Sequence, residues 1–498
     1  MSPAAGRILA IDVGLTNCKA VLFDLDGSII RRASVVYETR RPGPGRVEQE
    51  PAEWWRAAVE AVRALADPDR RQPGPIAMIG VTGHMHALAC VDANLRAVRP
   101  ALILGDRRAA GEADAIAAEV GAATVYAITG TAMDASMPAA KVRWLAAHEA
   151  GTLAATAWLL GCKDYLRARL TGEVATEPVD ACATSLYDIR TGEWSEPMAA
   201  AARAPLRALP PIRAPETLAG HLLPAPAAEL GLPAGTPVVI GAGDDVEVLG
   251  NGLLSGGACL EHLGTTGSIL AVASTATPDP AMVLELYPNT LAGRWVVGGS
   301  MTTAGAALEW ASRNLGFASL GTAQACLARW PVTADAPVFM PDLEGARGPV
   351  REPRALGAWL GLRPATARAD LMLAAFEGVA MGLQSILART EALVGRSGPI
   401  AVSNGDSADP RWLQVRADIY ARPLAVLETT EPTALGLLTL ATAALGVDRT
   451  PADAVRRIVR VREIVEPRAI EVTPRRREIH EAAFRALAQT WPLFWTGP

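Results

Sequence analysis

The residues best suited to chemistry near the start of the chain form a short polar turn between two apolar runs. Residues 8–27 read ILAIDVGLTNCKAVLFDLDG, so that Asp12 stands just before the turn. This pattern is typical of a β-hairpin with an acid at its tip. The glycine of the turn lets backbone N–H groups approach an anion, Thr16 and Asn17 add donors, and the Asp12 carboxylate is a ligand that Mg²⁺ prefers. The pattern favours a phosphate-binding turn, with an ordinary hairpin turn as the alternative.

A second turn of the same kind occurs about half a chain later. Residues 258–274 read ACLEHLGTTGSILAVAS, and a strand-like run again enters and leaves a turn that contains Gly264, Thr265 and Thr266. Two phosphate-type hairpins at this separation indicate an internal duplication. We therefore expect two similar halves, each built around one hairpin.

Two adjacent acids follow a strand predicted at residues 237–241, within the segment VVIGAGDDVEVLGNGLL. A carboxylate at the end of a strand can accept the proton of a hydroxyl group as that hydroxyl attacks a phosphoryl group. Asp244 is the candidate for this base. The alternative is that Asp244 or Asp245 caps the first turn of a helix, and the two residues can divide these roles.

Polar residues also follow a strand predicted at residues 75–83, where His84, Met85 and His86 begin a loop. Ligands gather beyond the carboxyl ends of strands in open α/β sheets, so Met85 and His86 are well placed for binding. A structural hydrogen bond is the alternative role for His86. Simpler roles are expected for other rings: core packing for Trp54, Trp55 and Trp144, a strand position for His262, and surface positions for His148, His221 and His480.

The elements that position these residues alternate between helices and strands, as in α/β proteins. A helix is predicted from Pro51 to Ala66, and an irregular Pro/Ala-rich connection with a short helix near Ala227 is predicted over residues 203–237. With 498 residues, half of them hydrophobic, the chain is long enough for two large lobes with separate cores.

Composition argues against several classes of partner. The formal net charge is −5 and the arginines form no basic stripe, so we expect no nucleic acid partner. No run approaches the ~18–20 apolar residues of a membrane span, and the first apolar run is too short for a secretory signal. The six cysteines occur singly, without metal-ligand spacing, which predicts reduced and buried thiols. We therefore expect a cytoplasmic, soluble protein that binds small molecules and no membrane.

Taken together and in this order, the motifs resemble those of the FGGY carbohydrate kinases over nearly the whole chain. Residues 12–19, DVGLTNCK, and 264–268, GTTGS, match the two phosphate motifs of that family, and Gly243-Asp244 matches its catalytic Gly-Asp. Further matches, most similar to the xylulokinases, are GHMH at 83–86, KDYLRARLTG at 163–172, TAG at 303–305, MPDLEGAR at 340–347, FEGVA at 376–380, NGDS at 404–407 and TALG at 433–436. So many motifs in the correct order make a chance match improbable.

The resemblance implies an α/β, two-lobed actin/hexokinase-like (ribonuclease H-like) ATPase fold with duplicated mixed-sheet domains and a cleft between them. It places a sugar-binding lobe with the catalytic base at residues 1–247 and a nucleotide-binding lobe at residues 248–498. It also implies ATP and Mg²⁺. Homodimers are common among similar proteins, so the resemblance leaves a homodimer open.

Carried over residue by residue, the resemblance assigns roles to the matching positions. Asp244 is the expected catalytic base and Asp12 the expected metal ligand. The expected sugar-binding residues are Met85, His86, Asp106, Asp244 and Asp245. The expected nucleotide-binding residues are Thr16, Asn17, Lys19, Gly264, Thr265, Thr266, Gly305, Glu309, Gly405 and Asp406.

Three departures from the family pattern bear on the ligands. Leu104-Gly105 replaces a Trp-Asn pair in the loop beside the sugar, which removes a hydrogen-bond donor and an aromatic wall. Asn404 and Asp406 stand where glycines are usual in the adenine loop. Asp245 stands where Asn or Gln normally follows the catalytic acid, and its charge raises the pKa of one acid of the pair or is relieved by a partner.

The resemblance implies an ATP-dependent sugar kinase, a phosphotransferase with an alcohol group as acceptor. D-Xylulose, converted to D-xylulose 5-phosphate, is the first candidate substrate, ahead of another sugar, an aldonate such as gluconate, or a polyol. A Met-His pair is similarly found in gluconate kinases, and Arg107 or Arg108 would supply the cation that an anionic substrate needs. A function of another class also stays open: a non-catalytic regulator that binds ATP and sugar on the same fold.

Overall fold

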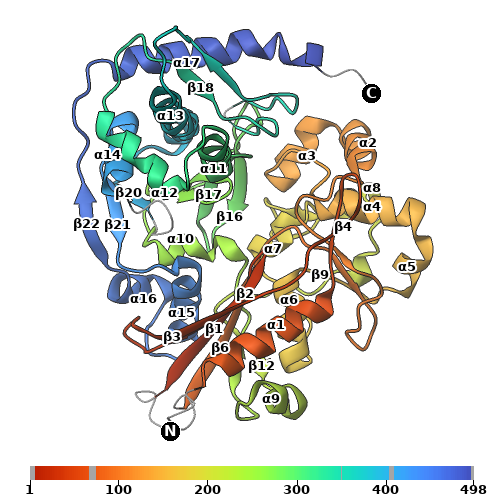
Figure 1. The fold of residues 1–498 in the computed structure, drawn as a ribbon. Coiled ribbons are helices and arrows are strands. Elements are labelled where there is room, and N and C mark those ends of the chain that lie inside the picture. Colours follow the sequence, from red (N-terminus) through yellow and green to blue (C-terminus); the bar gives the residue numbers. More distant parts are fainter. Residues whose placement is uncertain (1–5, 67–74, 349, 403–408, 495–498) are drawn as a thin grey trace. The chain divides into compact units, whose positions relative to one another are not determined.

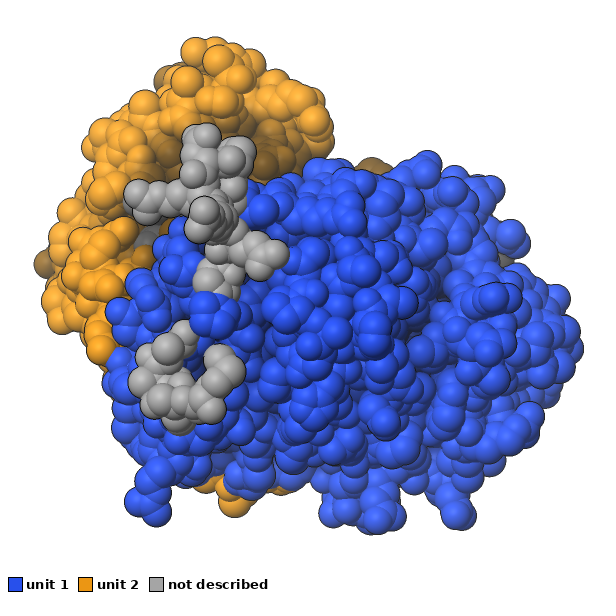
Figure 2. Space-filling model, turned by 90° about the horizontal axis from the view of Figure 1, so that it is seen from below, with its two compact units in different colours: residues 1–252, 286–295, 431–459 blue, residues 253–285, 296–430, 460–498 orange. Residues whose placement is uncertain are grey.

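The computed structural model describes residues 6–66, 75–348, 350–402 and 409–494. The chain divides into two compact units, which Figure 2 shows in different colours. The first unit contains residues 1–252, 286–295 and 431–459, and the second contains residues 253–285, 296–430 and 460–498. No single cut near residue 247 reproduces this division, because the second half of the chain contributes two segments to the first unit.

The first unit is built on a six-stranded mixed sheet, visible in the lower part of Figure 1. Its strand order is β12-β13-β6-β1-β2-β3. The pairs β1–β2, β2–β3 and β12–β13 are antiparallel, whereas β1–β6 and β6–β13 are parallel. The strands are β1 (Arg7–Val13), β2 (Asn17–Phe23), β3 (Ile29–Val36), β6 (Ile76–Gly83), β12 (Leu218–His221) and β13 (Pro237–Val239).

The second unit repeats this arrangement. Six of the seven strands of its sheet follow the order β17-β15-β14-β20-β21-β22, with β14–β15 and β21–β22 antiparallel and β14–β20 and β20–β21 parallel. Both sheets therefore place a hairpin beside two parallel strands and close with an antiparallel strand, which confirms the predicted duplication. The strands are β14 (Cys259–Leu263), β15 (Gly267–Ala273), β17 (Trp295–Met301), β20 (Ile400–Val402), β21 (Leu424–Leu427) and β22 (Val461–Val465).

Helices cover both faces of the first sheet. Neighbouring residues of β6 point to opposite faces: Ile79 packs in the core cluster that contains Trp54 of α1 (Pro51–Ala64), whereas a Cβ on Gly80 would contact Leu437 of α15 (Pro432–Ala444). The other helices of this unit are α2 (Ala110–Val120), α3 (Ala122–Thr129), α4 (Pro138–His148), α5 (Ala150–Ala155), α6 (Cys162–Thr171), α7 (Pro178–Ala183), α8 (Glu196–Ala201), α9 (Pro224–Leu230), α10 (Glu247–Gly250) and α16 (Pro451–Ile458), with 3₁₀ turns η2 (Leu206–Ala208) and η3 (Asp244–Val246).

Short strands supplement the main sheets. In the first unit they are β4 (Arg40–Gly43), β5 (Arg46–Gln49), β7 (Ala89–Val91), β8 (Ala101–Leu102), β9 (Trp158–Leu160), β10 (Tyr187–Asp188) and β11 (Glu193–Trp194). In the second unit they are β18 (Val338–Met340) and β19 (Ala358–Leu360). Strand β16 (Glu285–Pro288) lies where the chain passes from the second unit to the first.

The second unit is organised around one long helix, α13 (Arg368–Val394), visible near the top of Figure 1. An 18-residue window within this helix has a mean hydropathy of 1.6. The expectation that no segment is long and apolar enough for a membrane span is therefore wrong for α13. However, 83% of that window is buried inside the protein, and a core helix passes the same test. The other helical segments are α11 (Gly305–Asn314), α12 (Leu320–Ala323), η4 (Gln324–Arg329), α14 (Pro410–Tyr420), α17 (Thr473–Ala488) and η5 (Trp491–Phe494).

Burial confirms most expectations for the aromatic and sulfur-containing residues. The three tryptophans predicted to pack in the core, Trp54, Trp55 and Trp144, are buried. All six cysteines are buried and free, as predicted. The expected surface position of His480 is wrong, because this residue lies buried on α17, where burial lowers its pKa to about 4.

Candidate active site

The turn of the first hairpin is held by side chains from later segments. The backbone N–H of Gly14 donates to the carbonyl oxygen of Asn17 at 2.9 Å and closes the turn. The hydroxyl of Tyr37 donates to the carbonyl of Gly14, and the amide of Gln49 donates to the carbonyl of Leu15 at 2.8 Å. Thr16 is exposed at this fixed turn, where its hydroxyl and N–H can meet an anion.

Asp12 and Lys19 face each other across the same hairpin, because the register pairs them. Burial raises the pKa of Asp12 to about 6; Lys19 opposes this shift, while Glu431 and Glu247 add to it. Lys19 Nζ also lies 3.0 Å from Glu431 Oε2, in a segment that returns to the first unit from the second half of the chain. The positive charge predicted to meet phosphate is therefore shared with Glu431 in this structure.

The acid pair lies in the tight turn η3, directly after Gly243. Gly243 occupies the N-cap position and no side chain caps η3, so the capping role considered for the two aspartates is wrong. A Cβ on Gly243 would lie 2.9 Å from Asp180 Oδ1 and 3.2 Å from Met85 Sδ. Glycine suits this position because the side chains of Met85 and Asp180 pack against its backbone, which places Met85 against the residue that precedes Asp244.

Several carboxylates surround Asp244. Burial raises its pKa well above the usual 3.8, and the charge of Asp245 adds the next largest contribution, followed by those of Asp12, Glu247 and Asp180. The structure thus brings the predicted base, its acidic neighbour and the predicted metal ligand into one electrostatic cluster. A carboxylate whose ionised form is disfavoured in this way is a stronger proton acceptor, which is the property a general base needs.

A buried charge network supports the backbone of the acid pair. Glu177 Oε1 accepts hydrogen bonds from the N–H groups of Gly243 and Asp180, both at 3.0 Å. Lys163 Nζ lies 2.7 Å from Asp164 Oδ1, 3.2 Å from Asp180 Oδ2 and 3.9 Å from Glu177 Oε1. Burial lowers the pKa of Lys163, but these three carboxylates together outweigh it and raise that pKa.

Sequence reasoning assigned no role to this network. Its only signal was the pair of adjacent opposite charges, Lys163-Asp164, that begins the matched segment 163–172, since Glu177 belongs to no matched motif. The side chains of Lys163 and Glu177 are both fully buried, and burial of a charge is tolerated only where partners compensate it.

Lys141 holds the loop that carries Met85 and His86 in place. Lys141 Nζ donates to the carbonyls of His86 and Ile103 at 2.8 and 3.1 Å. His86 has a positive φ of 65°, and its Nδ1 lies 3.0 Å from the carbonyl oxygen of Ala183, so the structural hydrogen bond considered for it is present. Burial lowers the pKa of Lys141 to about 7, against the opposing charges of Asp106 and Asp134.

A small cavity of about 30 Å³ lies under this loop, lined by His84, Met85, His86, Asp164 and Asp180 among others. That volume is enough for a single water molecule. His84 is buried with its Nε2 atom lacking a protein partner among the described residues, and burial lowers its pKa to about 4. A neutral ring that accepts a hydrogen bond from one water is consistent with both observations.

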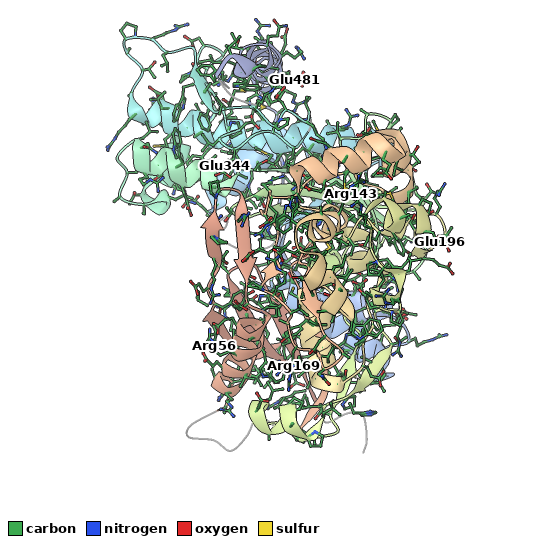
Figure 3. All side chains as sticks on the ribbon, turned by 90° about the vertical axis from the view of Figure 1, so that its right-hand side faces the viewer. Arg56, Arg143, Arg169, Glu196, Glu344 and Glu481 are labelled. Carbon is green, nitrogen blue, oxygen red and sulfur yellow. The ribbon has the colours of Figure 1, made fainter. Side chains whose placement is uncertain are left out.

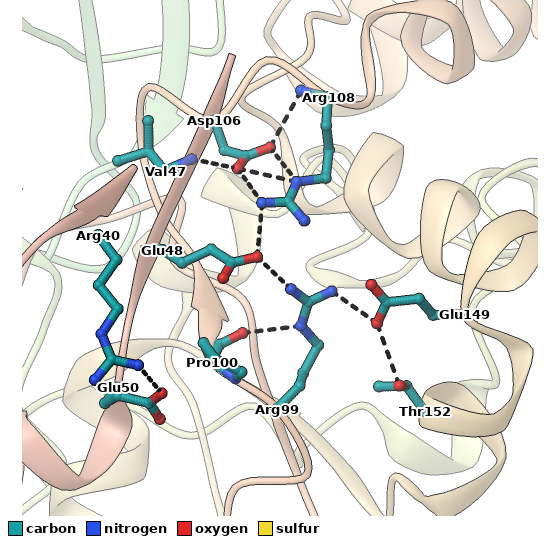
Figure 4. A network of polar contacts seen from close by, with 10 residues as sticks. All are labelled: Arg40, Val47, Glu48, Glu50, Arg99, Pro100, Asp106, Arg108, Glu149 and Thr152. Carbon is teal, nitrogen blue, oxygen red and sulfur yellow. Dashed lines mark hydrogen bonds and ion pairs between the residues drawn. The ribbon is translucent and has the colours of Figure 1, made fainter. Parts of the chain in front are cut away.

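Asp106 lies in the polar network of Figure 4. It is fully buried, and its oxygens accept hydrogen bonds from the N–H of Val47 at 2.7 Å and from the side chain of Arg108 at 2.8–3.0 Å. These hydrogen bonds give Asp106 a positioning role, and its direct contact with the sugar stays a prediction. Its carboxylate fixes the loop that contains the Leu104-Gly105 departure.

The same network decides which arginine can meet an anionic substrate. Arg108 donates to Glu48 at 2.7 Å as well as to Asp106, and only 4% of its side chain is exposed. Arg99 extends the network from Glu48 to Glu149 (Figure 4). Arg107 is half exposed and lies 3.4 Å from Asp134. Of the two arginines considered for this role, only Arg107 remains accessible.

In the second unit, the hairpin turn of β14 and β15 is docked onto the first turn of α11. The N–H of Gly305 donates to the carbonyl of Gly264 at 2.9 Å, and the N–H groups of Ala304 and Ala306 donate to the carbonyl of Thr265. A Cβ on Gly305 would lie 2.4 Å from the oxygen of Gly264, so only glycine permits this approach. The structure thus brings Gly264, Thr265 and Gly305 together.

The other predicted nucleotide residues divide into two groups. Thr266 is exposed at the same turn, and Glu309 is exposed on α11. Asn404, Gly405 and Asp406 lie outside the described residues.

The candidate metal position rests on one carboxylate. Within residues 6–66, 75–348, 350–402 and 409–494, no group of three or more His, Cys, Asp or Glu side chains could hold a metal ion. Mg²⁺ at phosphate-transfer sites is commonly bound through one or two carboxylates together with substrate phosphates and water. Asp12, half-buried at the end of β1, fits that mode of binding.

Comparisons with known proteins find similar chains and similar structures. Residues 7–249 match the N-terminal domain, and residues 261–445 the C-terminal domain, of the FGGY family of carbohydrate kinases. The chain is 30% identical to a xylulose kinase from Escherichia coli strain K12, over 84% of this chain and 85% of that protein. It is 28% identical to a gluconokinase from Bacillus licheniformis over 88% of each chain. Xylulose kinase from Rhodospirillum rubrum has a similar structure, with a TM-score of 0.88 and 28% identity over 97% of this chain and 99% of that one.

Proposed function

The chain belongs to the FGGY family of carbohydrate kinases, and is thus a phosphotransferase that transfers a phosphoryl group from ATP to an alcohol group of a sugar; we propose that this sugar is D-xylulose and the product D-xylulose 5-phosphate. The observation that carries the proposal is the position of Asp244. The preceding residue, Gly243, is held by the buried carboxylate of Glu177, and Met85 packs against Gly243.

In the proposed mechanism Asp244 accepts the proton of the attacking sugar hydroxyl. Met85 and His86 contact the sugar, and Lys141 and Asp106 keep the two loops around it in place. Thr16 and Thr265 donate to phosphate oxygens at their hairpin turns. Asp12 would hold Mg²⁺, which neutralises charge on the phosphoryl groups during transfer.

An aldonate is the second candidate substrate, because gluconokinases are also among the similar proteins. A carboxylate substrate would want a cation, and Arg107 is the accessible one. D-Xylulose stays the first candidate substrate because Arg108, the other cation of that loop, is already paired with Asp106 and Glu48. A homodimer and a cytoplasmic location stay predictions.

The experiment that tests the proposed substrate is ADP release from MgATP over a panel of ketopentoses, aldonates, polyols and glycerol, with a no-sugar control. We expect the highest kcat/KM with D-xylulose. The variant Arg107→Gln should leave this value within about threefold, since a neutral ketose forms no ion pair with the lost cation. A signal with gluconate alone that Arg107→Gln abolishes would reassign the substrate, and silence with every sugar despite ATP binding would favour the non-catalytic regulator.

The pH profile offers a separate test of the acid pair. Because the pKa of Asp244 is raised, kcat/KM should rise with pH. The midpoint of this rising limb of the pH profile should lie above 3.8, the usual pKa of an aspartate. Asp245→Asn removes the largest charge contribution after burial, so that limb should shift to lower pH. The measurement is kcat/KM for the best sugar across the acidic and neutral pH range, buffered at constant ionic strength. An unchanged or upward-shifted limb would show that Asp245 does not set the pKa of the base.

A further inference from the structure

The second unit contains a cavity that none of the residues assigned to sugar or nucleotide lines. It has a volume of about 420 Å³ and lies against α13, α17 and the segment after β18. Sites for small molecules typically measure about 300–1,000 Å³. Its walls are held together by Arg476 of α17, which pairs with Glu377 of α13 and donates to the carbonyls of Ala336 and Pro337.

Two side chains at the wall of this cavity keep a buried acceptor without a hydrogen-bond partner in the described part of the chain. They are Gln384, through Oε1, and His480, through Nε2. Gln384 is 6% exposed and His480 is 7% exposed. His480 is hydrogen-bonded to the backbone of Phe339, and its lowered pKa keeps the ring neutral, so Nε2 is an acceptor. An unpaired buried acceptor destabilises the fold unless a ligand or water supplies a donor.

Two further polar groups, Asp342 and Arg477, lie at the wall. Asp342 is buried, and burial raises the pKa of its carboxyl to about 7 without an opposing cation. Arg477 donates to the carbonyl of Ile419, but its Nε–H has no partner among the described residues. The wall therefore offers several acceptors and one donor, a combination that hydroxyl groups satisfy because each can both donate and accept.

The charges around the cavity largely cancel. Arg389 forms two hydrogen bonds, at 2.7 and 2.8 Å, with the carboxylate of Asp279. Arg485 lies 3.9 Å from Glu481, which Figure 3 labels on α17. A multiply charged anion such as a nucleotide would need a net positive wall, so the cavity favours an uncharged ligand.

Apolar side chains complete the wall. Met301 and Phe484 line the cavity together with the polar groups. Phe484 is fixed edge-on against Trp491, with ring centroids 5.1 Å apart, and so offers a rigid apolar surface. This combination suits a ring molecule with an apolar face and hydroxyl groups at its edge.

We propose that this cavity is a second binding site, separate from the catalytic one, for an uncharged, hydroxyl-bearing ring molecule between a pentose and a nucleoside in size. The site does not depend on which sugar the enzyme phosphorylates. A free sugar and a nucleoside present the same chemistry, a ring with neighbouring hydroxyl groups.

The test uses the intact protein and saturation-transfer difference NMR with D-ribose and adenosine as separate probes. Saturating ADP, Mg²⁺ and the best sugar are present throughout, so that the catalytic site is filled. We expect at least one probe to bind, and the probe that binds distinguishes a free sugar from a nucleoside. No signal from any probe would overturn the proposal and leave the cavity to water.

Two variants assign the signal to the cavity. Ser385→Phe fills the space from α13 and should abolish probe binding, whereas the matched control Ser385→Ala should retain it. Gln384→Met removes the unpaired acceptor without changing the shape much, so we expect about tenfold weaker probe binding but an equal or higher melting temperature without the probe. All variants should retain the KM values for ATP and sugar.

Two results contradict the assignment. Probe binding that Ser385→Phe leaves intact would place the probe elsewhere on the protein. A lower melting temperature for Gln384→Met would show that Gln384 has a structural partner and is not kept for a ligand. Circular dichroism of each variant establishes that it is folded before binding is compared.

Discussion

Replacement of Asp244 by asparagine is expected to lower kcat by about 10²–10⁴ while ATP affinity changes little. The amide has the same shape as the carboxylate but cannot accept the proton of the sugar hydroxyl. The turn itself should persist, because Gly243 is held through its backbone N–H by Glu177 and not by Asp244. The measurement is steady-state ADP release with the best sugar, together with the dissociation constant of ADP by calorimetry.

The same substitution should stabilise the protein at alkaline pH. The pKa of Asp244 is raised in the folded state, chiefly by burial, so its contribution to stability is present below the unfolded-state pKa and is lost as pH rises through the folded-state value. The neutral asparagine side chain has no such dependence on pH, so the unfolding midpoint of Asp244→Asn in urea should exceed that of the native enzyme at about pH 8. A functional residue that destabilises its own fold is a common consequence of selection for activity.

Asp245→Asn is the matched control for this experiment. It removes the neighbouring charge from the same turn, and we expect a much smaller loss of kcat. Nearly full activity of Asp244→Asn together with a large loss in Asp245→Asn would reverse the assignment of the base.

The features that could be predicted from sequence are those whose determinants lie close together in the chain. Each hairpin is specified by two apolar runs and a glycine-containing turn within about twenty residues. The predicted strand before His84 and the predicted strand before Asp244 are both present, as β6 and β13. Because ligands gather at the carboxyl ends of such strands, the element order predicts a site at this edge of the sheet.

The features that were missed depend on contacts between residues far apart in sequence. Lys19 pairs with Glu431, 412 positions away, and Asp106 bonds the backbone of Val47, 59 positions away. Composition and spacing contain no information on such pairs. Asp106 was therefore assigned to the sugar from its motif, although its burial gives it a structural role.

The burial of polar residues was the second feature that could not be predicted from the sequence. His480 follows three arginines in the sequence, which predicts a surface position. In the structure it is buried on α17, which packs against α13. Lys163 and Glu177 likewise carry charges that composition alone places at the surface. A charged residue in the core is stable only when its partners are present, and those partners come from different elements of the first unit.

The second large effect is expected for Lys163→Met, which removes the only lysine of the buried network under the acid pair. The carboxylates of Asp164, Asp180 and Glu177 would then lose their shared cation. Breaking a buried ion pair by removal of one partner typically costs about 3–5 kcal/mol, because a charge is left uncompensated in the interior. We expect a loss of this size in the free energy of unfolding, measured by urea denaturation at about pH 8, where all three acids are ionised in the unfolded chain.

Arg456→Gln is the control for a pair that does not lie in the interior. Arg456 lies 2.9 Å from Asp453 on α16, with 64% of its side chain exposed, and its loss should cost less than about 1 kcal/mol. An equally small cost for Lys163→Met would show that the three acids are neutral in the folded enzyme. A whole buried ion network can often be replaced by apolar residues at little cost in stability, so stability alone does not explain why this network is kept. One of its acids, Glu177, accepts the hydrogen bond of the Gly243 N–H. The charges are then retained because one of them fixes the turn that presents the catalytic base.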